Sequence, residues 1–445
     1  MNNPQPMSTL DQPRNNIQVS AEYLTFKAWA HEKLVERTDE LGHDFAVMSK
    51  PAVRRFVALE MDRLIQEIRI PLNEKEVEQL IDDLTNELTG FGPLEGPLRD
   101  PEVEDILVNG PYNIFIGKKG VIEPSDLVFI DEWHLMRIIY RLLLPTGRRV
   151  DESSPMVDAR LPLYGRINVV IPPLALDGPT LSIRRFPADP LKAKDLIDHG
   201  TLTPEMLEFL QAAVQNRCNI LISGGTSSGK TTLLNILASF ARPQERIVTI
   251  EDTAELNLQA RHIVRLETRP GGHDGAGAID ARDLLRNALR MRPDRIIVGE
   301  VRGSEAMEML QAMTTGHDGS MGTLHANSPR EALQRLELLL SFAGFPGQEV
   351  TLRRQIASAL EIIVQVARLA DGRRRVLSIT EVTGMGDNIV ALQEHFRYEP
   401  RTLPDGTLQD HWINNGLRPH TRKLHHYQPR SQGLQNWAHE EVSRG

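Results

Sequence analysis

The sequence is poor in cysteine, with Cys218 as its only thiol among 445 residues. A single thiol cannot form an internal disulfide, so a cross-linked secreted scaffold is excluded and a reducing cytoplasm is expected. Long hydrophobic runs are missing as well, because no apolar stretch approaches the ~20 residues of a membrane span. The polar beginning of the chain lacks a signal-peptide pattern. We therefore expect a cytoplasmic protein, with any membrane association coming through a partner.

An excess of basic residues is also absent, since the formal net charge is −9 and aromatic residues make up only 5% of the chain. Proteins that bind nucleic acids generally carry a basic stripe interleaved with aromatic side chains. No nucleic acid is therefore expected as a partner. The hydrophobic content of 40% and charged content of 25% are those of a globular protein with room for two or three domains.

The most informative stretch is Gly224 to Thr231, which reads Gly-Gly-Thr-Ser-Ser-Gly-Lys-Thr and matches the pattern G-x-x-x-x-G-K-T. An apolar run at 218–223 precedes it and a helical pattern at 231–240 follows, which is the context of a phosphate-binding loop. Loop N–H groups and the helix N-terminus favour an anion, and Lys230 would reach the terminal phosphates of a nucleoside triphosphate. The hydroxyl of Thr231 would bind Mg²⁺. The expected nucleotide-binding residues are Gly224, Gly225, Thr226, Ser227, Ser228, Gly229, Lys230, Thr231 and Thr232. The alternative is a glycine-rich turn that happens to contain lysine.

Hydrolysis also needs carboxylates, and two apolar runs end in acidic residues. Residues 246–250 lead into Glu251 and Asp252, and residues 295–298 lead into Gly299 and Glu300. Parallel strands present their carboxyl ends at the ligand-binding edge of an open sheet, so both glutamates are candidate catalytic groups. The alternative is that these acids only cap loops.

The stretch Gly316 to His325 places two histidines among four glycines, where the backbone can approach a ligand closely. On spacing alone, a buried histidine bonded to a carbonyl is the favoured interpretation. Metal ligation is weaker, because no cysteine or carboxylate cluster of ligand spacing lies nearby.

The order of patterns predicts an α/β fold from about residue 196 onward, which contains the phosphate loop, and a smaller α+β domain before it. Expected strands at 219–223, 246–250, 263–266 and 295–298 alternate with helices at 231–240 and 280–291. Asn73 and Ser328 carry the N-cap and capping-box pattern of helix starts, and Asp371-Gly372 marks a hairpin. The expected parts are a disordered tail at 1–20, an N-terminal helical segment at 21–72, the α+β domain at 73–186, a linker at 187–195, and the ATPase domain with a C-terminal extension at 196–445.

The combination of motifs resembles the secretion and pilus traffic ATPase superfamily. The P-loop at 224–231, Glu251-Asp252, Val-Gly-Glu-Val-Arg at 298–302 and the histidine stretch at 316–325 look like its Walker A, Asp box, Walker B and His box. Stretches of the N-terminal half look like the tight-adherence (Tad/Cpa-type) pilus assembly ATPases: residues 90–98, 106–111, 147–160, 171–179 and 180–186. The similarity covers about residues 75 to 425. Residues 161–165 depart from it, with Leu-Pro-Leu-Tyr-Gly where the family usually carries an Asp-Gly turn.

The resemblance implies a homo-hexameric motor that hydrolyses ATP, with Mg²⁺, to power pilus assembly or secretion through inner-membrane platform proteins. It also implies that each subunit holds ATP between a smaller N-terminal domain and a RecA-like P-loop ATPase domain at the C-terminal end. It implies that Thr231 and Glu300 organise Mg²⁺, that Glu251 positions the attacking water, and that His325 senses the γ-phosphate with His317 packed behind it. The two glutamates are allowed to exchange roles. The arginines that approach the nucleotide from the N-terminal domain correspond to Arg160, Arg166, Arg184 and Arg185, of which we expect two to be functional.

Three rival hypotheses stay open at this point. A type II or type IV secretion ATPase would do the same chemistry for a different machine. A RecA-like nucleic-acid motor belongs to another class, and DNA-stimulated ATPase activity would identify it. A nucleotide-dependent scaffold that hydrolyses slowly would be distinguished from a motor by its steady-state turnover.

Overall fold

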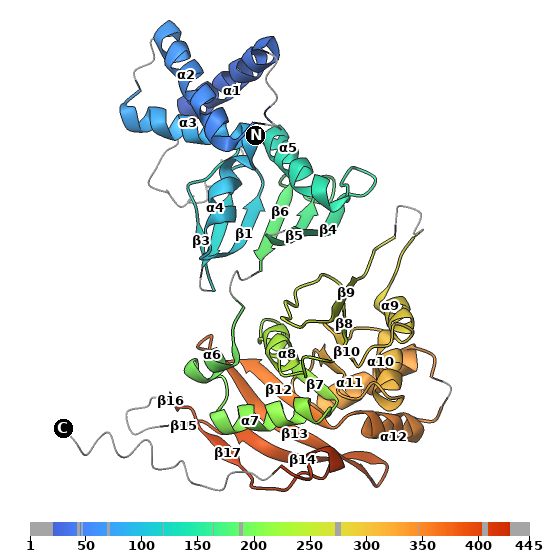
Figure 1. Ribbon diagram of the computed structural model, residues 1–445. Helices are drawn as coiled ribbons and strands as arrows, with labels where there is room; N and C mark the ends of the chain where they lie inside the picture. The colour runs from blue at the N-terminus through green and yellow to red at the C-terminus, as the bar shows by residue number, and fades with distance from the viewer. Residues whose placement is uncertain are drawn as a thin grey trace, which may run out of the picture. The chain divides into compact units, whose positions relative to one another are not determined.

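The computed structural model describes residues 21–41, 45, 48–68, 72–118, 120–162, 164–186, 190–271, 277–345, 347–402 and 408–427. The chain divides into two compact units, Met1–Ala188 and Asp189–Gly445 (Figure 1). The tail predicted at 1–20 lies outside the described residues, as do residues 187–189 of the predicted linker. The predicted fold class is confirmed, because a mixed α/β unit with a phosphate loop follows a smaller unit of helices and a separate sheet.

The N-terminal unit begins with three helices that share one apolar core: α1 (Ala21–Leu41), α2 (Lys50–Ile68) and α3 (Glu74–Thr89). The predicted capping box is confirmed, since Asn73 accepts a hydrogen bond from the Glu76 N–H and the Glu76 carboxylate accepts one from the Asn73 N–H. The boundary predicted between residues 72 and 73 runs through this core, because α3 turns its apolar face towards α1 and α2.

The rest of this unit is a six-stranded antiparallel sheet in the order β3-β2-β1-β6-β5-β4. Its strands are β1 (Val103–Asn109), β2 (Ile114–Lys118), β3 (Val121–Pro124), β4 (Met156–Leu161), β5 (Gly165–Val170) and β6 (Thr180–Arg185). The inner face packs on α5 (Glu132–Leu143), and the short helix α4 (Glu95–Arg99) precedes the sheet. The apolar residues alternate along β5 and β6, as expected of a sheet with one buried face.

A buried ionic cluster ties the helices of this unit to its sheet layer. Lys27 of α1 lies 2.9 Å from Oε1 of Glu87 on α3, and Nε2 of His134 on α5 lies 2.6 Å from Oε2. Burial opposes the charge of Glu87, but the hydrogen bond of His134 and the charge of Lys27 lower the pKa of Glu87 to about 2. The three side chains therefore act as one buried unit that no pattern in the sequence indicated.

The C-terminal unit is built on a nine-stranded sheet in the order β17-β14-β13-β12-β7-β11-β10-β8-β9. The parallel strands are β7 (Ile220–Gly224), β8 (Ile247–Glu251), β9 (Ile263–Glu267), β10 (Arg295–Val298), β11 (Met321–Leu324) and β12 (Ile362–Arg368). Antiparallel strands extend the sheet on the β12 side: β13 (Arg374–Gly386), β14 (Ile389–Tyr398) and β17 (Trp412–Asn414). The four predicted strands and the hairpin at Asp371-Gly372 are confirmed.

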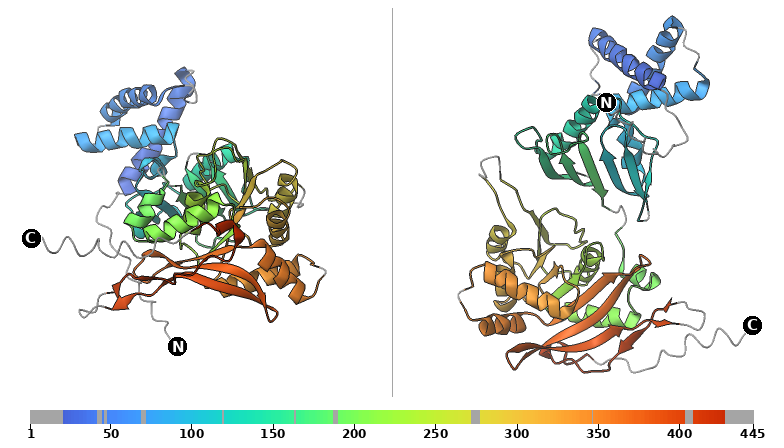
Figure 2. Two further views of the ribbon diagram at one scale, coloured as in Figure 1. Left: turned by 60° about the horizontal axis from the view of Figure 1, so that its bottom comes forward. Right: turned by 180° about the vertical axis from the view of Figure 1, so that it is seen from behind.

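Helices cover both faces of this sheet (Figure 2). One apolar core includes α6 (Ala193–Asp198), α7 (Pro204–Gln215) and α8 (Lys230–Ala238), and the other includes α9 (Ala281–Ala288), α10 (Glu305–Thr314), α11 (Pro329–Phe342) and α12 (Glu349–Ala359). Strand β7 contributes Ile220 and Ile222 to the first core and Leu221 to the second. Burial on both faces explains its continuous apolar run.

Two local expectations needed correction or extension. Ser328 caps α11 as predicted, but the Glu331 carboxylate accepts from the N–H of Asn327 rather than that of Ser328, so the capping box is not closed. The extension after residue 385, which the sequence left without a shape, contains β14, β15 (Arg401–Thr402), β16 (Leu408–Gln409), β17 and the 3-10 helix Arg422–Leu424. None of the described helices combines the length and the apolar character needed to span a membrane.

Candidate active site

The phosphate loop connects β7 to α8, as its motif requires. Two residues of the loop adopt left-handed backbone, Ser227 with φ 57° and Gly229 with φ 95°. At Gly224 an added Cβ would lie 2.3 Å from the carbonyl oxygen of Val366, so only glycine fits against the neighbouring strand β12. The loop is thus shaped by its glycines and by the strand beside it.

Lys230 is folded onto the loop and is only 7% exposed. Its Nζ donates to the carbonyl oxygens of Gly224 (3.0 Å) and Gly225 (2.7 Å). Burial lowers the pKa of Lys230, although the nearby carboxylate of Glu300 opposes this shift. A largely buried ammonium group at the start of α8 is suited to bind phosphate oxygens.

Sheet topology brings three side chains together at the carboxyl edge. Strand β11 lies between β7 and β10, so His325 after β11 stands between Lys230 after β7 and Glu300 after β10. Nζ of Lys230 lies 3.4 Å from Nδ1 of His325, and Nε2 of His325 lies 2.7 Å from Oε1 of Glu300. Burial and the charge of Lys230 lower the pKa of His325. A neutral imidazole that accepts at Nδ1 and donates from Nε2 fits both partners.

Glu300 is the acid of this cluster, and it carries a second partner that the sequence analysis did not assign. Arg302 donates to its Oε2 at 2.5 Å and lies 3.5 Å from Asp252. Burial favours the neutral form of Glu300, but Arg302, His325 and Lys230 together hold the pKa of this carboxyl below its usual value. Glu300 is therefore ionised at neutral pH. Arg302 ends the motif Val-Gly-Glu-Val-Arg at 298–302. Its position two residues after Glu300 was the sequence feature that could have indicated this ion pair.

Glu251 lies one strand further along the edge, at the end of β8, and is 4% exposed. Its Oε2 accepts hydrogen bonds from the N–H groups of Glu255 (2.8 Å) and Leu256 (2.9 Å). Among the described residues no group donates to its buried Oε1. Burial raises the pKa of Glu251 to about 7, against the effect of the two N–H groups.

Of the other residues expected in this unit, Thr231 and Thr232 lie beside Lys230, whereas His317 lies away from it. Thr231 and Thr232 lie in the first turn of α8, directly after Lys230. His317, which we expected behind His325, lies before β11 while His325 follows it, so the strand separates the two histidines. Ser320 donates to the carbonyl of His317. His317 therefore belongs to the opposite edge of the sheet.

Three of the four arginines expected from the N-terminal unit form a row on the outer face of its sheet. Arg160 pairs with Arg166 across β4 and β5, and Arg166 pairs with Arg184 across β5 and β6. Arg184 continues the row to Asp105 of β1, with Nε 3.2 Å from the carboxylate. Arg166 lies 3.4 Å from Asp158. Cross-strand pairing therefore collects a strip of positive charge from separate strands.

Arg185 points to the other face, because successive side chains in a strand alternate. Its guanidinium donates to the backbone carbonyls of Asp100 and Val103, next to the end of α4. The structure thus separates Arg185, which binds carbonyl groups within its own unit, from the row of Arg160, Arg166 and Arg184.

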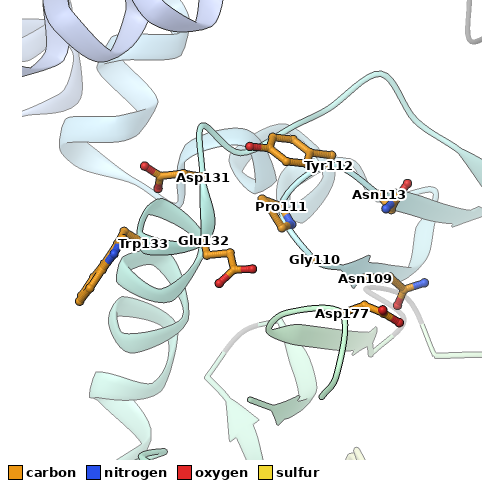
Figure 3. A pocket seen from close by; sticks show the side chains of 9 residues that line it. All are labelled: Asn109, Gly110, Pro111, Tyr112, Asn113, Asp131, Glu132, Trp133 and Asp177. Carbon is orange, nitrogen blue, oxygen red and sulfur yellow. The ribbon is translucent and has the colours of Figure 1, made fainter. Parts of the chain in front are cut away.

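A hollow of about 390 Å³ in the N-terminal unit provides a contrast with the phosphate loop (Figure 3). It lies at the start of α5, and Tyr112 and Trp133 are among its lining residues. Three carboxylates, Asp131, Glu132 and Asp177, line it, and no lysine or arginine does. Such a lining repels phosphate groups, so this hollow is not a nucleotide site.

Comparison with known proteins identifies the family. The family model described as "Type II/IV secretion system protein" matches residues 87–404. A candidate conjugal transfer protein of Mycobacterium tuberculosis is 38% identical over 314 residues, which cover 69% of this chain and 89% of that protein. Type IV secretion system protein VirB11 of Bartonella quintana is 32% identical over 349 residues, covering 68% of this chain and 96% of that protein. The crystal structure of the VirB11 ATPase of Brucella suis with sulphate aligns with a TM-score of 0.36 and 28% identity, covering 64% of this chain and 91% of the other.

The family match covers the phosphate loop, both glutamates, His325 and the arginine row. The matched residues therefore include candidate site residues from both units. The expected resemblance is confirmed at this level. The matched residues include the phosphate loop between β7 and α8, which nucleotide binding and ATP hydrolysis require. The chain belongs to the type II/IV secretion system protein family, the secretion and pilus traffic ATPases.

Proposed function

We propose that this protein is a hexameric motor that hydrolyses ATP to drive assembly of a Tad-type pilus or secretion at the inner membrane. The observation that carries the proposal is the contact chain Lys230–His325–Glu300 beside the phosphate loop. The Tad-type assignment rests on the sequence stretches of the N-terminal half, including 90–98 and 147–160.

The residues present fit ATP and Mg²⁺. The loop has a glycine at the position where a Cβ would strike Val366, and Lys230 places an ammonium group at its centre. A hydroxyl at Thr231 and an ionised carboxylate at Glu300 are oxygen donors of the kind that Mg²⁺ prefers. Thr231 and Glu300 would hold the ion, and the ion would supply positive charge to the phosphate oxygens of the nucleotide.

The protein residues divide the remaining work. Lys230 binds the terminal phosphates, and His325 links this lysine to Glu300, so that a change at the γ-phosphate reaches both. Glu251 is the proposed group that positions the attacking water. Its buried Oε1 without a described donor and its pKa of about 7 support this role, because a general base works best when its pKa lies near the working pH.

The arginine row of the N-terminal unit is the proposed source of positive charge for the transferring phosphoryl group. Arg184 and Arg166 are the two we select, since both are at least partly exposed and their described ion pairs are with carboxylates of the same sheet. A guanidinium supplied by a separate unit couples hydrolysis to the motion of that unit. Arg185 is engaged with backbone carbonyls and supports the sheet instead.

The proposed assembly is a homo-hexamer in the cytoplasm. Its proposed partners are the platform proteins of a pilus or secretion machine in the inner membrane. If neighbouring chains complete each site, ATPase activity per subunit rises with protein concentration. Sedimentation and ATPase rate measured over one dilution series test this. A monomer that hydrolyses ATP at the full rate would contradict the ring.

A further inference from the structure

Three consecutive arginines, Arg373, Arg374 and Arg375, lie where the hairpin turn enters β13, and their side chains bind different partners. Arg373 donates to Asp371 (2.7 Å) and Asp410 (2.9 Å). Arg375 is buried and donates to the carbonyl of His199 (3.0 Å) and to Asp410 (2.7 Å). Arg374 alone of the three donates to the phosphate loop, from its Nε to the carbonyl oxygen of Ser227 at 3.2 Å.

The register of the sheet explains why Arg374 reaches the loop. Strand β12 runs parallel to β7, with Val366 opposite Gly224 at the start of the loop. Arg374 of β13 pairs with Arg368, two residues beyond Val366. The hairpin therefore extends past the end of β7 and stands beside the loop. The Cδ atom of Arg374 would lie 3.3 Å from a Cβ at Gly229, so its aliphatic stem packs there.

The bonded carbonyl belongs to a conformation that needs support. Ser227 has φ 57°, in the left-handed region that is unfavourable for a residue with a side chain. A planar trans peptide points its carbonyl and the next N–H in opposite directions. When Arg374 holds the Ser227 carbonyl, the N–H of Ser228 is fixed facing away from Arg374. Ser228 lies in the stretch whose N–H groups surround a phosphate in loops of this motif.

We propose that Arg374 is a positioning residue for ATP, which orients the Ser228 N–H for phosphate binding by holding the Ser227 carbonyl. The proposal rests on the ATP-binding role of the loop. Arg374 acts through the loop backbone, and its role lies in nucleotide affinity rather than in the chemical step. Charged donors to a carbonyl are worth more than neutral ones, so the loss is measurable.

Two substitutions at position 374 and one at a neighbour test this. Arg374→Met keeps the stem on Gly229 and removes the donor, whereas Arg374→Lys keeps a charged donor. Arg373→Ala removes an adjacent guanidinium that binds Asp371 and Asp410 and no loop atom among its described contacts. For each full-length variant the KM for ATP, the kcat, the affinity for a fluorescent ATP analogue and the thermal unfolding midpoint are measured.

For Arg374→Met we expect about a tenfold rise in KM and in analogue dissociation constant, with kcat within about threefold of the parent. Arg374→Lys should recover most of the affinity, and Arg373→Ala should match the parent. A parental KM in Arg374→Met overturns the proposal. So does a fall in kcat and unfolding midpoint without a change in KM, or an Arg374→Lys variant no better than Arg374→Met. An unsubstituted protein that does not hydrolyse ATP would instead contradict the proposed function.

Discussion

The two units assemble charged residues in different ways. In the C-terminal unit, Lys230, His325 and Glu300 follow three parallel strands and meet at one edge, where they contact each other. In the N-terminal unit, Arg160, Arg166 and Arg184 occupy facing positions on antiparallel strands and form a row across a sheet face. A parallel sheet gathers side chains at strand ends, whereas an antiparallel sheet gathers them side by side.

Burial follows the same division. Lys230 is 7% exposed, while the side chain of Arg184 is 64% exposed. Charges near solvent are screened by salt and interact weakly with one another, but they are free to take a new partner. In the C-terminal unit, Lys230, His325 and Glu300 are already in contact, and we call this cluster the preformed site. In the N-terminal unit, the arginine row carries positive charge near solvent, where an ion pair can be exchanged for another partner.

The largest expected effect is at the preformed site. Lys230→Ala should abolish ATP turnover and weaken nucleotide binding, because the ammonium group interacts with phosphate in the ground and transition states alike. Lys194→Ala, at an exposed position of α6, is the matched control and should hydrolyse ATP normally. Steady-state turnover and analogue binding measure both variants, and parental activity in Lys230→Ala would remove the loop from the mechanism.

The arginine row should produce the next largest effect. Replacing Arg166 and Arg184 together by alanine should lower kcat by ~1000-fold while an ATP analogue still binds, because the stabilised charge develops in the transition state. Arg63→Ala changes an exposed arginine of the same unit and serves as the control. Single-turnover rates at two salt concentrations give the measurement, and a normal rate in the double variant would leave the row without a catalytic role.

Substituting each strand-end glutamate tests the preformed site from its acidic side. Glu300→Gln and Glu251→Gln should each keep nucleotide binding and slow hydrolysis by at least ~100-fold, the scale of a positioned catalytic group. If both variants turn over ATP at the parental rate, these acids are not part of the mechanism. Folding is checked by thermal unfolding, because Glu251 also anchors the N–H groups of Glu255 and Leu256.

A smaller effect is expected from pH. Burial raises the pKa of Glu251 to about 7, and the proposed base is active only as the carboxylate. The rate should therefore rise by about tenfold from pH 6 to pH 8 and level off above the pKa. Glu251→Gln should lose this dependence, as measured by kcat across the same buffers. An unchanged profile in that variant would assign the titration to another group.

The smallest effect on turnover is expected in the buried cluster of the N-terminal unit. Lys27→Met leaves Glu87 buried with His134 as its remaining partner in the cluster, which should cost about 3 kcal/mol of stability. Turnover at low temperature should stay within about twofold. Lys33→Met on the same helix, at a more exposed ion pair, is the control. Chemical unfolding measures the difference, and equal stability of the two variants would make the cluster unimportant.

Local patterns in the sequence were sufficient where the chemistry is local. The phosphate loop, the capping box at Asn73, the strands ending at Glu251 and Glu300, and the hairpin at Asp371-Gly372 each depend on a few neighbouring residues. The helices α5, α7, α10 and α12 were not assigned, although Asp131 caps α5 and Thr203 followed by Pro204 begins α7 with the usual N-cap pattern. Strand β14, after residue 385, was missed because its buried residues do not alternate regularly along the strand.

The sequence by itself determined that this chain binds a nucleoside triphosphate and which residues form the loop, because a phosphate site at a strand–helix junction is specified by consecutive residues. Only the tertiary structure decided which distant residues join it. Insertion of β11 between β7 and β10 placed His325 against Lys230 and Glu300. Strand alternation separated Arg184 from Arg185, and the hairpin register placed Arg374 against Ser227. These choices depend on strand order and pairing, which are set by packing across the whole sheet rather than by neighbours in the chain.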